Sequence, residues 1–227
     1  MHTLPLPSAE TRQFDLIIFD WDGTLMDSTA MIARALQSAF AEHGLAMPSD
    51  QQARHVIGLG MAEALTWLLP EGDQTLHQQL AQSYRQNWRQ GADTLVFYPH
   101  AITLLEALRV AGYTLAVATG KSRAGLDRAL DEMQVRHHFA VTRCADESFS
   151  KPHPAMVNEI LDRLQIPAGR TLVIGDTTHD LEMAHQAHVA AIGILHGAHD
   201  KATLLTAKPH ALVADLPAFA DWLRHHG

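Results

Sequence analysis

The segment Asp20-Trp21-Asp22-Gly23 carries the residue types in this chain that most clearly suggest chemistry. It follows the apolar run Leu16-Ile17-Ile18-Phe19. Residues two apart in an extended chain point to the same side, so Asp20 and Asp22 can face one site. Two neighbouring carboxylates repel each other, and a divalent cation or a shared proton relieves that repulsion. Gly23 permits a sharp turn and a close approach of the backbone to a ligand.

Three later segments add polar groups of the same kind. A second apolar run ends in Thr119-Gly120, the segment Ser150-Lys151-Pro152-His153-Pro154 opens a helical pattern, and a third apolar run ends in Gly175-Asp176. Asp180 follows Asp176 by four residues, which places both on one face of a helix. Asp176 is also an ordinary residue for capping a helix. Asp180 is open to three roles: a metal ligand, a ligand through water, or a partner of Lys151.

The elements that must position these groups follow from hydrophobic patterning. Short apolar runs bounded by polar residues are typical of buried strands in a parallel sheet. The carboxyl ends of such strands are where open α/β sheets bind ligands. Helical patterns alternate with the runs, so the chain is predicted to form a doubly wound, Rossmann-like parallel sheet. The further predicted strands are 115–118, 139–141, 172–174, 190–195 and 211–213.

The alternation of strand and helix is interrupted between Ser28 and Gly91. Only helical patterns occur there, starting with Met31, Ala62 and Leu76, and a glycine-rich segment, Val56-Ile57-Gly58-Leu59-Gly60, separates the first two. This block is therefore interpreted as a helical insertion between the first strand and its expected helix. The glycine-rich segment is either an ordinary turn between helices or a loop that contacts substrate.

In their order and spacing, the four polar segments resemble the motifs of the haloacid dehalogenase-like hydrolases. The closest resemblance is to the phosphoglycolate phosphatase and β-phosphoglucomutase subgroup, and it extends from about Phe14 to Asp215. It implies a core of residues 1–26 and 95–227, in which 1–13 form a loose tail. It also implies a helical cap domain over residues 27–94.

The resemblance assigns roles to individual residues. Asp20 is the expected nucleophile, which forms an aspartyl-phosphate, and Asp22 is the expected general acid and base. Mg²⁺ is the expected cofactor, since it prefers oxygen ligands and neutralises phosphoryl charge. Its expected ligands are Asp20, Asp22 through the backbone carbonyl, Asp176, and Asp180 directly or indirectly.

The remaining expected site residues bind phosphate or substrate. Thr119 and Lys151 are expected to take part in catalysis, and the phosphate-binding set is Gly23, Thr119, Gly120 and Lys151. Lys121 and Arg123, next to Thr119, are expected to be solvated, with contact to substrate as the alternative. The cap residues expected to contact the leaving group are Arg54, Gly58, Leu59 and Gly60.

Composition limits the partners. The chain of 227 residues has a formal charge of −8 and no basic run that would suggest nucleic acid. It has no apolar stretch near the ~20 residues of a membrane helix. The single cysteine, Cys144, is expected to be packed and suits a reducing cytoplasm. The sixteen histidines lack the spacing of a zinc site and are expected mostly at the surface. Monomer and dimer both stay open.

The leading hypothesis is thus a Mg²⁺-dependent phosphatase that acts on a small phosphorylated metabolite, phosphoglycolate-like or a sugar phosphate. A sugar-phosphate mutase, which passes the phosphoryl group to a sugar hydroxyl, is the first alternative. A non-catalytic phosphate-binding module is the second alternative. It is disfavoured because the four residues that such a module could lose are all present: Asp20, Asp22, Lys151 and Asp176. Asp22 disfavours a dehalogenase, and the absence of lysine from 28–91 disfavours a phosphonate-cleaving enzyme.

Overall fold

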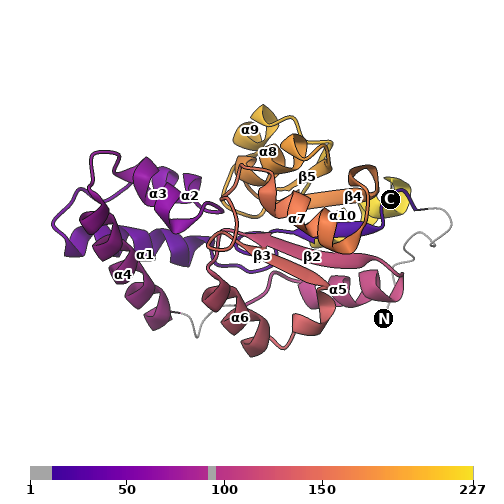
Figure 1. Ribbon diagram of the computed structural model, residues 1–227, viewed down its shortest axis with the longest axis horizontal. Helices are drawn as coiled ribbons and strands as arrows, with labels where there is room; N and C mark the ends of the chain where they lie inside the picture. The colour runs from indigo at the N-terminus through magenta and orange to yellow at the C-terminus, as the bar shows by residue number, and fades with distance from the viewer. Residues whose placement is uncertain (1–11, 92–95, 227) are drawn as a thin grey trace.

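The computed structural model describes residues 12–91 and 96–226, and shows a parallel sheet with helices on both faces (Figure 1). Residues 1–11 of the predicted tail and the predicted cap boundary near 94 lie outside the described residues. The sheet has six strands in the order β3-β2-β1-β4-β5-β6. The strands are β1 (Leu16–Phe19), β2 (Thr114–Thr119), β3 (Val141–Cys144), β4 (Thr171–Gly175), β5 (Ala190–Ile194) and β6 (Ala211–Val213).

The central strand β1 lies between β2 and β4. Leu16 is opposite both Thr114 and Thr171, so the three strands run in register and end at the same edge. The strand order reverses between β1 and β4, and such a reversal opens a crevice at the carboxyl edge of the sheet. The predicted doubly wound parallel fold is confirmed.

The two faces of the sheet have separate hydrophobic cores, because side chains alternate along each strand. Ile17 and Phe19 belong to one buried cluster, and Leu16 and Ile18 belong to the other. Figure 1 shows α5 and α6 on one side of β2 and β3, and α7, α8 and α9 on the other. The bounds are α5 (Ala101–Val110), α6 (Arg123–Glu132), α7 (Ala155–Leu164), α8 (Thr178–Gln186), α9 (Lys201–Thr206) and α10 (Leu216–His226), with one-turn 3₁₀ helices at Arg136–His138 and Ala168–Arg170.

Four helices between β1 and α5 gather at one end of the molecule and are called the cap here (Figure 1). The apolar side chains of Phe40, Leu65 and Leu80 form the middle of a small core of their own. The cap helices are α1 (Thr29–Glu42), α2 (Asp50–His55), α3 (Met61–Leu68) and α4 (Gln74–Gly91).

The short helix α2 was not predicted, because its sequence DQQARH has no apolar periodicity. Its start is nevertheless encoded: Ser49 accepts from the Gln52 backbone N–H, and the Gln52 side chain accepts from the Ser49 backbone, which forms a capping box. The glycine-rich segment 56–60 is the loop between α2 and α3. No helix of residues 12–91 and 96–226 has the length and apolar character needed to cross a membrane.

Two predicted boundaries were wrong. The third strand is Val141–Cys144 rather than 139–141. Phe139 does not pair with the neighbouring strand, and its ring instead packs edge-on against Trp21, with ring centroids 6.2 Å apart. The helix expected to open at Ser150 begins at Ala155, so Lys151 lies in the turn ahead of α7 rather than in its first turn.

Candidate active site

Asp20 and Asp22 lie directly after β1, in the crevice where the strand order reverses. Asp20 is 1% exposed and Asp22 is 7% exposed. Gly23 has a φ of +91°, and a Cβ at this position would collide with the Asp176 carboxylate. Glycine is therefore required twice over, by its backbone conformation and by the approach of Asp176. The turn holds the two aspartates at the edge of the sheet.

Lys151 connects β1 to α8 through two charged hydrogen bonds. Its Nζ donates to Oδ1 of Asp20 at 2.6 Å and to Oδ1 of Asp180 at 2.6 Å, and all three side chains are 0–1% exposed. Burial alone would lower the pKa of Lys151, but the charges of Asp180 and Asp20 outweigh it and raise that pKa. Lys151 thus stays charged. Of the roles considered for Asp180, a direct contact with Lys151 is present.

Asp176 does not cap α8, although an aspartate at a strand end often caps a helix. Thr177 is the N-cap instead: its hydroxyl accepts from the Asp180 backbone, and its backbone N–H donates to Oδ2 of Asp180 at 3.1 Å. The Asp176 carboxylate accepts from the Thr24 hydroxyl at 2.9 Å and from the Ala198 backbone N–H at 2.7 Å. The capping box therefore leaves the Asp176 carboxylate in the crevice.

The backbone packs tightly around these carboxylates. A Cβ at Gly175 would collide with the Asp180 side chain, and a Cβ at Gly197 would collide with that of Asp176. The crevice is thus closed on its inner side by glycine backbone. Both collisions involve carboxylates that hydrogen bonds already fix in place.

Asp20, Asp176 and Asp180 fit a divalent cation. Each offers one carboxylate oxygen, and these three oxygens lie within 4.8 Å of one another. Oδ2 of Asp20 is buried and has no hydrogen-bond partner among the described residues. Burial and the charge of Asp180 raise the pKa of Asp176 to about 7, and burial likewise raises the pKa of Asp20 well above its usual value. Three carboxylates against one ammonium leave negative charge that a hard dication such as Mg²⁺ would neutralise.

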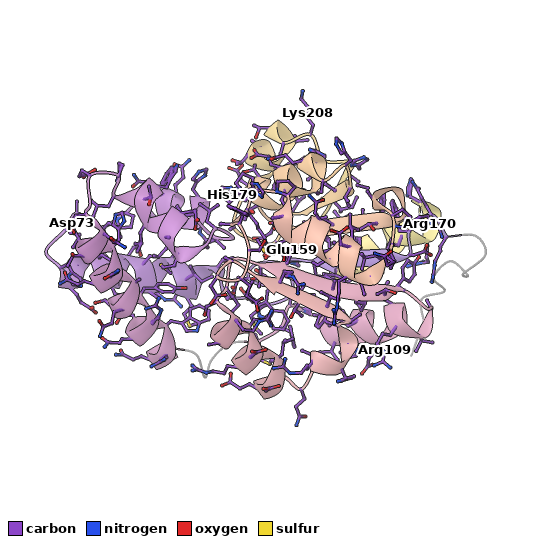
Figure 2. All side chains as sticks on the ribbon, viewed as in Figure 1. Asp73, Arg109, Glu159, Arg170, His179 and Lys208 are labelled. Carbon is purple, nitrogen blue, oxygen red and sulfur yellow. The ribbon has the colours of Figure 1, made fainter. Side chains whose placement is uncertain are left out.

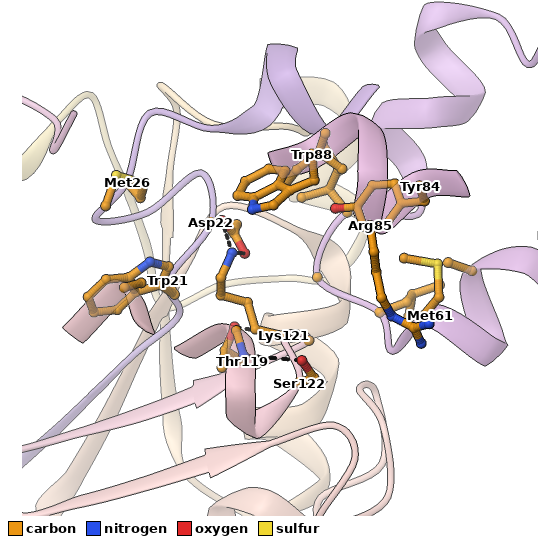
Figure 3. Close-up of a pocket in the computed structure, with 18 of the residues that line it drawn as sticks. Trp21, Asp22, Met26, Met61, Tyr84, Arg85, Trp88, Thr119, Lys121 and Ser122 are labelled. Carbon is orange, nitrogen blue, oxygen red and sulfur yellow. Dashed lines mark hydrogen bonds and ion pairs between the residues drawn. The ribbon is translucent and has the colours of Figure 1, made fainter. Parts of the chain in front are cut away.

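Asp22 has a different environment. Nζ of Lys121 lies 3.0 Å from both of its carboxylate oxygens, and the Ser28 hydroxyl donates to Oδ1 at 2.8 Å. The Asp22 side chain is not in the group of three oxygens described above. Lys121, expected to be solvated, is instead ion-paired, and its Nζ lies 4.4 Å from the centre of the Trp88 ring of the cap (Figure 3). Its neighbour Arg123 is bound to Glu147 at 2.7 Å.

Thr119 and Gly120 end β2 beside this pair. The Thr119 hydroxyl accepts from the Lys121 backbone N–H at 3.2 Å, and Ser122 caps α6 by accepting from the Gly125 N–H. A hydroxyl and helix-terminal N–H groups suit a phosphate. Both residues line a cavity of about 310 Å³ between the cap and the sheet edge.

Some of the predicted site residues line the cavity and others do not. Asp20, Asp22, Thr119 and Gly120 line it, and so do Gly58 and Leu59 from the cap loop. Gly23 and Lys151 do not line it. Arg54 is ion-paired with Asp50 at 2.9 Å and does not line the cavity. The Gly60 backbone N–H donates to the Ser150 hydroxyl at 2.7 Å, so Gly60 fastens the loop to the core.

The histidines were expected mostly at the surface, but two of them, His179 of α8 and His199 ahead of α9, are buried and hold the cap against the core. His179 and His199 are 8% and 5% exposed, and Nε2 of each ring donates to the backbone carbonyl of His55, at 2.7 and 3.2 Å. Nδ1 of His199 accepts from the Thr178 N–H, which fixes the proton on Nε2. Figure 2 shows His179 at the junction of the cap and the core.

Sequence reasoning also missed Lys121, Trp88 and Tyr84 as cavity residues. Tyr84 and Trp88 are four apart in α4, and this spacing is equally typical of a helix face in a core. Their rings are stacked with centroids 6.3 Å apart. For Lys121, the available signal was its position directly after Thr119-Gly120, at the entrance of a helix.

The strand order, the inserted helical cap and the polar residues at the carboxyl edge define a capped α/β hydrolase. Residues 17–194 match the family described as haloacid dehalogenase-like hydrolase, and the chain belongs to that family. The expected relation to its phosphatases is confirmed by similar proteins. The probable phosphatase IndB of Dickeya dadantii is 36% identical over 204 residues, which cover 87% of this chain and 88% of that protein. The phosphoglycolate phosphatase of Pasteurella multocida is 29% identical and covers 87% and 92%.

Solved structures agree with this assignment of the fold. A hydrolase from Pseudomonas syringae has a TM-score of 0.86 at 22% identity and covers 93% of this chain and 98% of its own. A predicted phosphoglycolate phosphatase from Haemophilus somnus has a TM-score of 0.81 at 26% identity and covers 95% and 99%. The chain is therefore an enzyme of the haloacid dehalogenase-like phosphatase type.

Proposed function

We propose that this chain is a Mg²⁺-dependent phosphatase that hydrolyses a small phosphorylated metabolite through an aspartyl-phosphate on Asp20. One observation carries the proposal: Asp20 and Asp22 line the same cavity but are held by different lysines, Lys151 and Lys121. Two carboxylates in distinct environments can take distinct roles in one reaction. Asp20 is buried and clamped, as suits a nucleophile, and Asp22 is partly open to the leaving group.

The reaction has two steps. A carboxylate oxygen of Asp20 attacks phosphorus, the bond from phosphorus to the leaving oxygen breaks, and Asp22 donates a proton to that oxygen. A water molecule then attacks phosphorus, gives its proton to Asp22 and releases inorganic phosphate and the free Asp20 carboxylate. Lys151 and the Thr119 hydroxyl hold the phosphoryl oxygens, and cap closure excludes bulk water.

The residues that would hold Mg²⁺ are Asp20, Asp176 and Asp180, whose oxygens converge within 4.8 Å. When bound, the ion supplies positive charge against the phosphoryl oxygens. The hydrogen bonds from His179 and His199 to the backbone carbonyl of His55 help to hold the cap against the core. The proposed cap residues Gly58 and Leu59 would contact the leaving group from the cap side of the cavity.

The test is phosphate release from phosphoglycolate, hexose phosphates, nucleotides and pyrophosphate, with Mg²⁺ or with EDTA. We expect release from one or two compounds that EDTA abolishes. Asp20→Asn should abolish release while circular dichroism shows that the fold is retained. Asp162→Asn, at an exposed position of α7, is the matched control.

Retained activity in Asp20→Asn would refute the proposed nucleophile. Rapid isomerisation of a hexose phosphate with slow release of phosphate would instead identify the mutase. Binding of phosphate without turnover of any compound would identify the non-catalytic module. Oligomeric state and the cytoplasmic location expected from the sequence stay predictions.

A further inference from the structure

The loop of residues 195–199, which follows β5, helps to fix the carboxylate of Asp176. The Ala198 backbone N–H donates to Oδ2 of Asp176 at 2.7 Å, and the His199 backbone N–H donates to the Asp176 carbonyl at 3.3 Å. Gly197 packs so closely that a Cβ there would collide with the Asp176 side chain. The loop therefore sets the position of one of the three carboxylates that fit a divalent cation.

The same loop packs against the cap. The Ala198 side chain is 9% exposed and belongs to a buried apolar cluster whose other buried members all come from the cap. Nε2 of His199 donates to the backbone carbonyl of His55 at 3.2 Å, while Nδ1 accepts from the Thr178 backbone N–H at 3.1 Å. The His55 and His199 rings are also stacked, with centroids 5.4 Å apart. The His199 imidazole thus joins the loop to the cap and to the start of α8.

The other two carboxylates of the group are held by core residues. Asp20 and Asp180 both accept from Lys151, and Asp180 also accepts from the backbone N–H of Thr177. Asp176 differs, because one donor to its carboxylate lies in a loop that packs against the cap. Opening of the cap would therefore loosen Asp176 and leave the other two carboxylates in place.

We propose that Ala198 and His199 are positioning residues that couple closure of the cap to the binding of Mg²⁺ by Asp176. This rests on the proposed function, which supplies the identity of the cation. When the cap is closed, the 195–199 loop holds the Asp176 carboxylate beside the other two, so little ordering is left for the cation to impose. When the cap is open, the loop loses both of its contacts with the cap, and the affinity for the cation falls.

The coupling acts in both directions. If closure of the cap strengthens the binding of a cation by some factor, the bound cation stabilises the closed cap by the same factor. Couplings between two sites usually amount to about 5- to 150-fold in affinity. Because the closed cap excludes bulk water from the cavity, Asp20 is best shielded from solvent when the metal site is loaded.

The first test is isothermal titration calorimetry of the full chain with Mg²⁺ alone, in the absence of phosphate and substrate. His199→Leu should raise the dissociation constant by about tenfold, because the hydrogen bond to the cap is lost. His199→Gln should keep it close to the wild-type value, since the amide can still donate to the His55 carbonyl. His210→Leu is the matched control: its ring also accepts a backbone N–H, that of Ala191, but it lies ahead of β6 at the opposite edge of the sheet.

Gly120→Ala separates coupling through the cap from a local effect on the loop. The atoms nearest to a Cβ at this position belong to Leu59 and Gly58 of the cap, so the substitution pushes the cap away without altering the 195–199 loop. It should also raise the dissociation constant for Mg²⁺, by about fivefold or more. Gly169→Ala, where a Cβ meets nothing within 4 Å, should leave it unchanged.

The second test measures the cap directly, by the distance between spin labels on Gln51→Cys of α2 and Lys201→Cys of α9, both at exposed positions, while the native Cys144 is buried. Mg²⁺ should shift the population toward the shorter distance, and His199→Leu should weaken that shift.

Unchanged affinity for Mg²⁺ in both His199→Leu and Gly120→Ala would overturn the inference while leaving the proposed phosphatase intact. A loss in His199→Leu alone, with no effect of Mg²⁺ on the label distance, would also overturn it, since a purely local role of the loop predicts that result. A wild-type chain that binds no Mg²⁺ would instead count against the proposed function, and the inference would fall with it.

Discussion

Substituting Gly120 by alanine tests whether the cap must close tightly on the core. A Cβ at Gly120 would stand 2.4 Å from the carbonyl oxygen of Leu59 and 2.5 Å from that of Gly58. Ordinary contact begins at 3.4 Å, so the cap loop would have to retreat by about 1.0 Å, the difference between 3.4 and 2.4 Å. A misplacement of about 1 Å can cost about 10²-fold in rate when groups must be aligned. We therefore expect Gly120→Ala to lower kcat/KM by about 100-fold.

The assay is phosphate release under the conditions that give the wild-type chain its best activity. The melting temperature should stay within about 2 °C, because opening of the cap relieves the collision without disturbing either core. Gly169→Ala is the matched control, since a Cβ there meets nothing within 4 Å, and it should change kcat/KM by less than about twofold. A stable Gly120→Ala protein with more than half of the wild-type activity would refute the argument from cap closure.

Two further predictions concern buried charge and the buried thiol. Lys151→Met should destabilise the metal-free chain by about 3–5 kcal/mol in urea unfolding, because Asp20 and Asp180 lose their buried partner. The loss should be larger at pH 8 than at pH 5, since lower pH protonates Asp20, whose folded-state pKa burial raises well above its usual value; a pH-independent loss would contradict this. Burial raises the pKa of Cys144 to about 12, so iodoacetamide at pH 8 should label it only after unfolding. Rapid labelling of the native chain would contradict its burial.

The sheet and its catalytic edge could be predicted because they follow from local patterns. Apolar runs located β1, β2 and β4, and the polar residues after each run had to meet once those strands paired in parallel. Asp20, Thr119 and Asp176 are therefore neighbours for a reason that is visible in the sequence. The first and last residues of the strands could not all be predicted. The start of β3 is an example, since the position of Phe139 depends on its packing against Trp21.

The contacts between cap and core could not be predicted, because they depend on how two separately folded units meet. Lys121 resembles a surface lysine until Asp22 and Trp88 are brought to its two sides. His179 and His199 resemble surface histidines until a backbone carbonyl of the cap lies between them. Sequence periodicity does not predict such contacts, because each depends on how segments that are distant in the sequence are placed relative to one another.

The glycine backbone behind the carboxylates has a consequence for the mutational tolerance of this protein. Gly23, Gly175 and Gly197 would each drive a Cβ into Asp176 or Asp180. None of the three lines the cavity. In a saturation library selected for activity, we expect these positions to admit no replacement, while several cavity-lining residues of the cap admit many. The close packing of these three glycines against the carboxylates thus limits the tolerated substitutions more severely than recognition of the leaving group does.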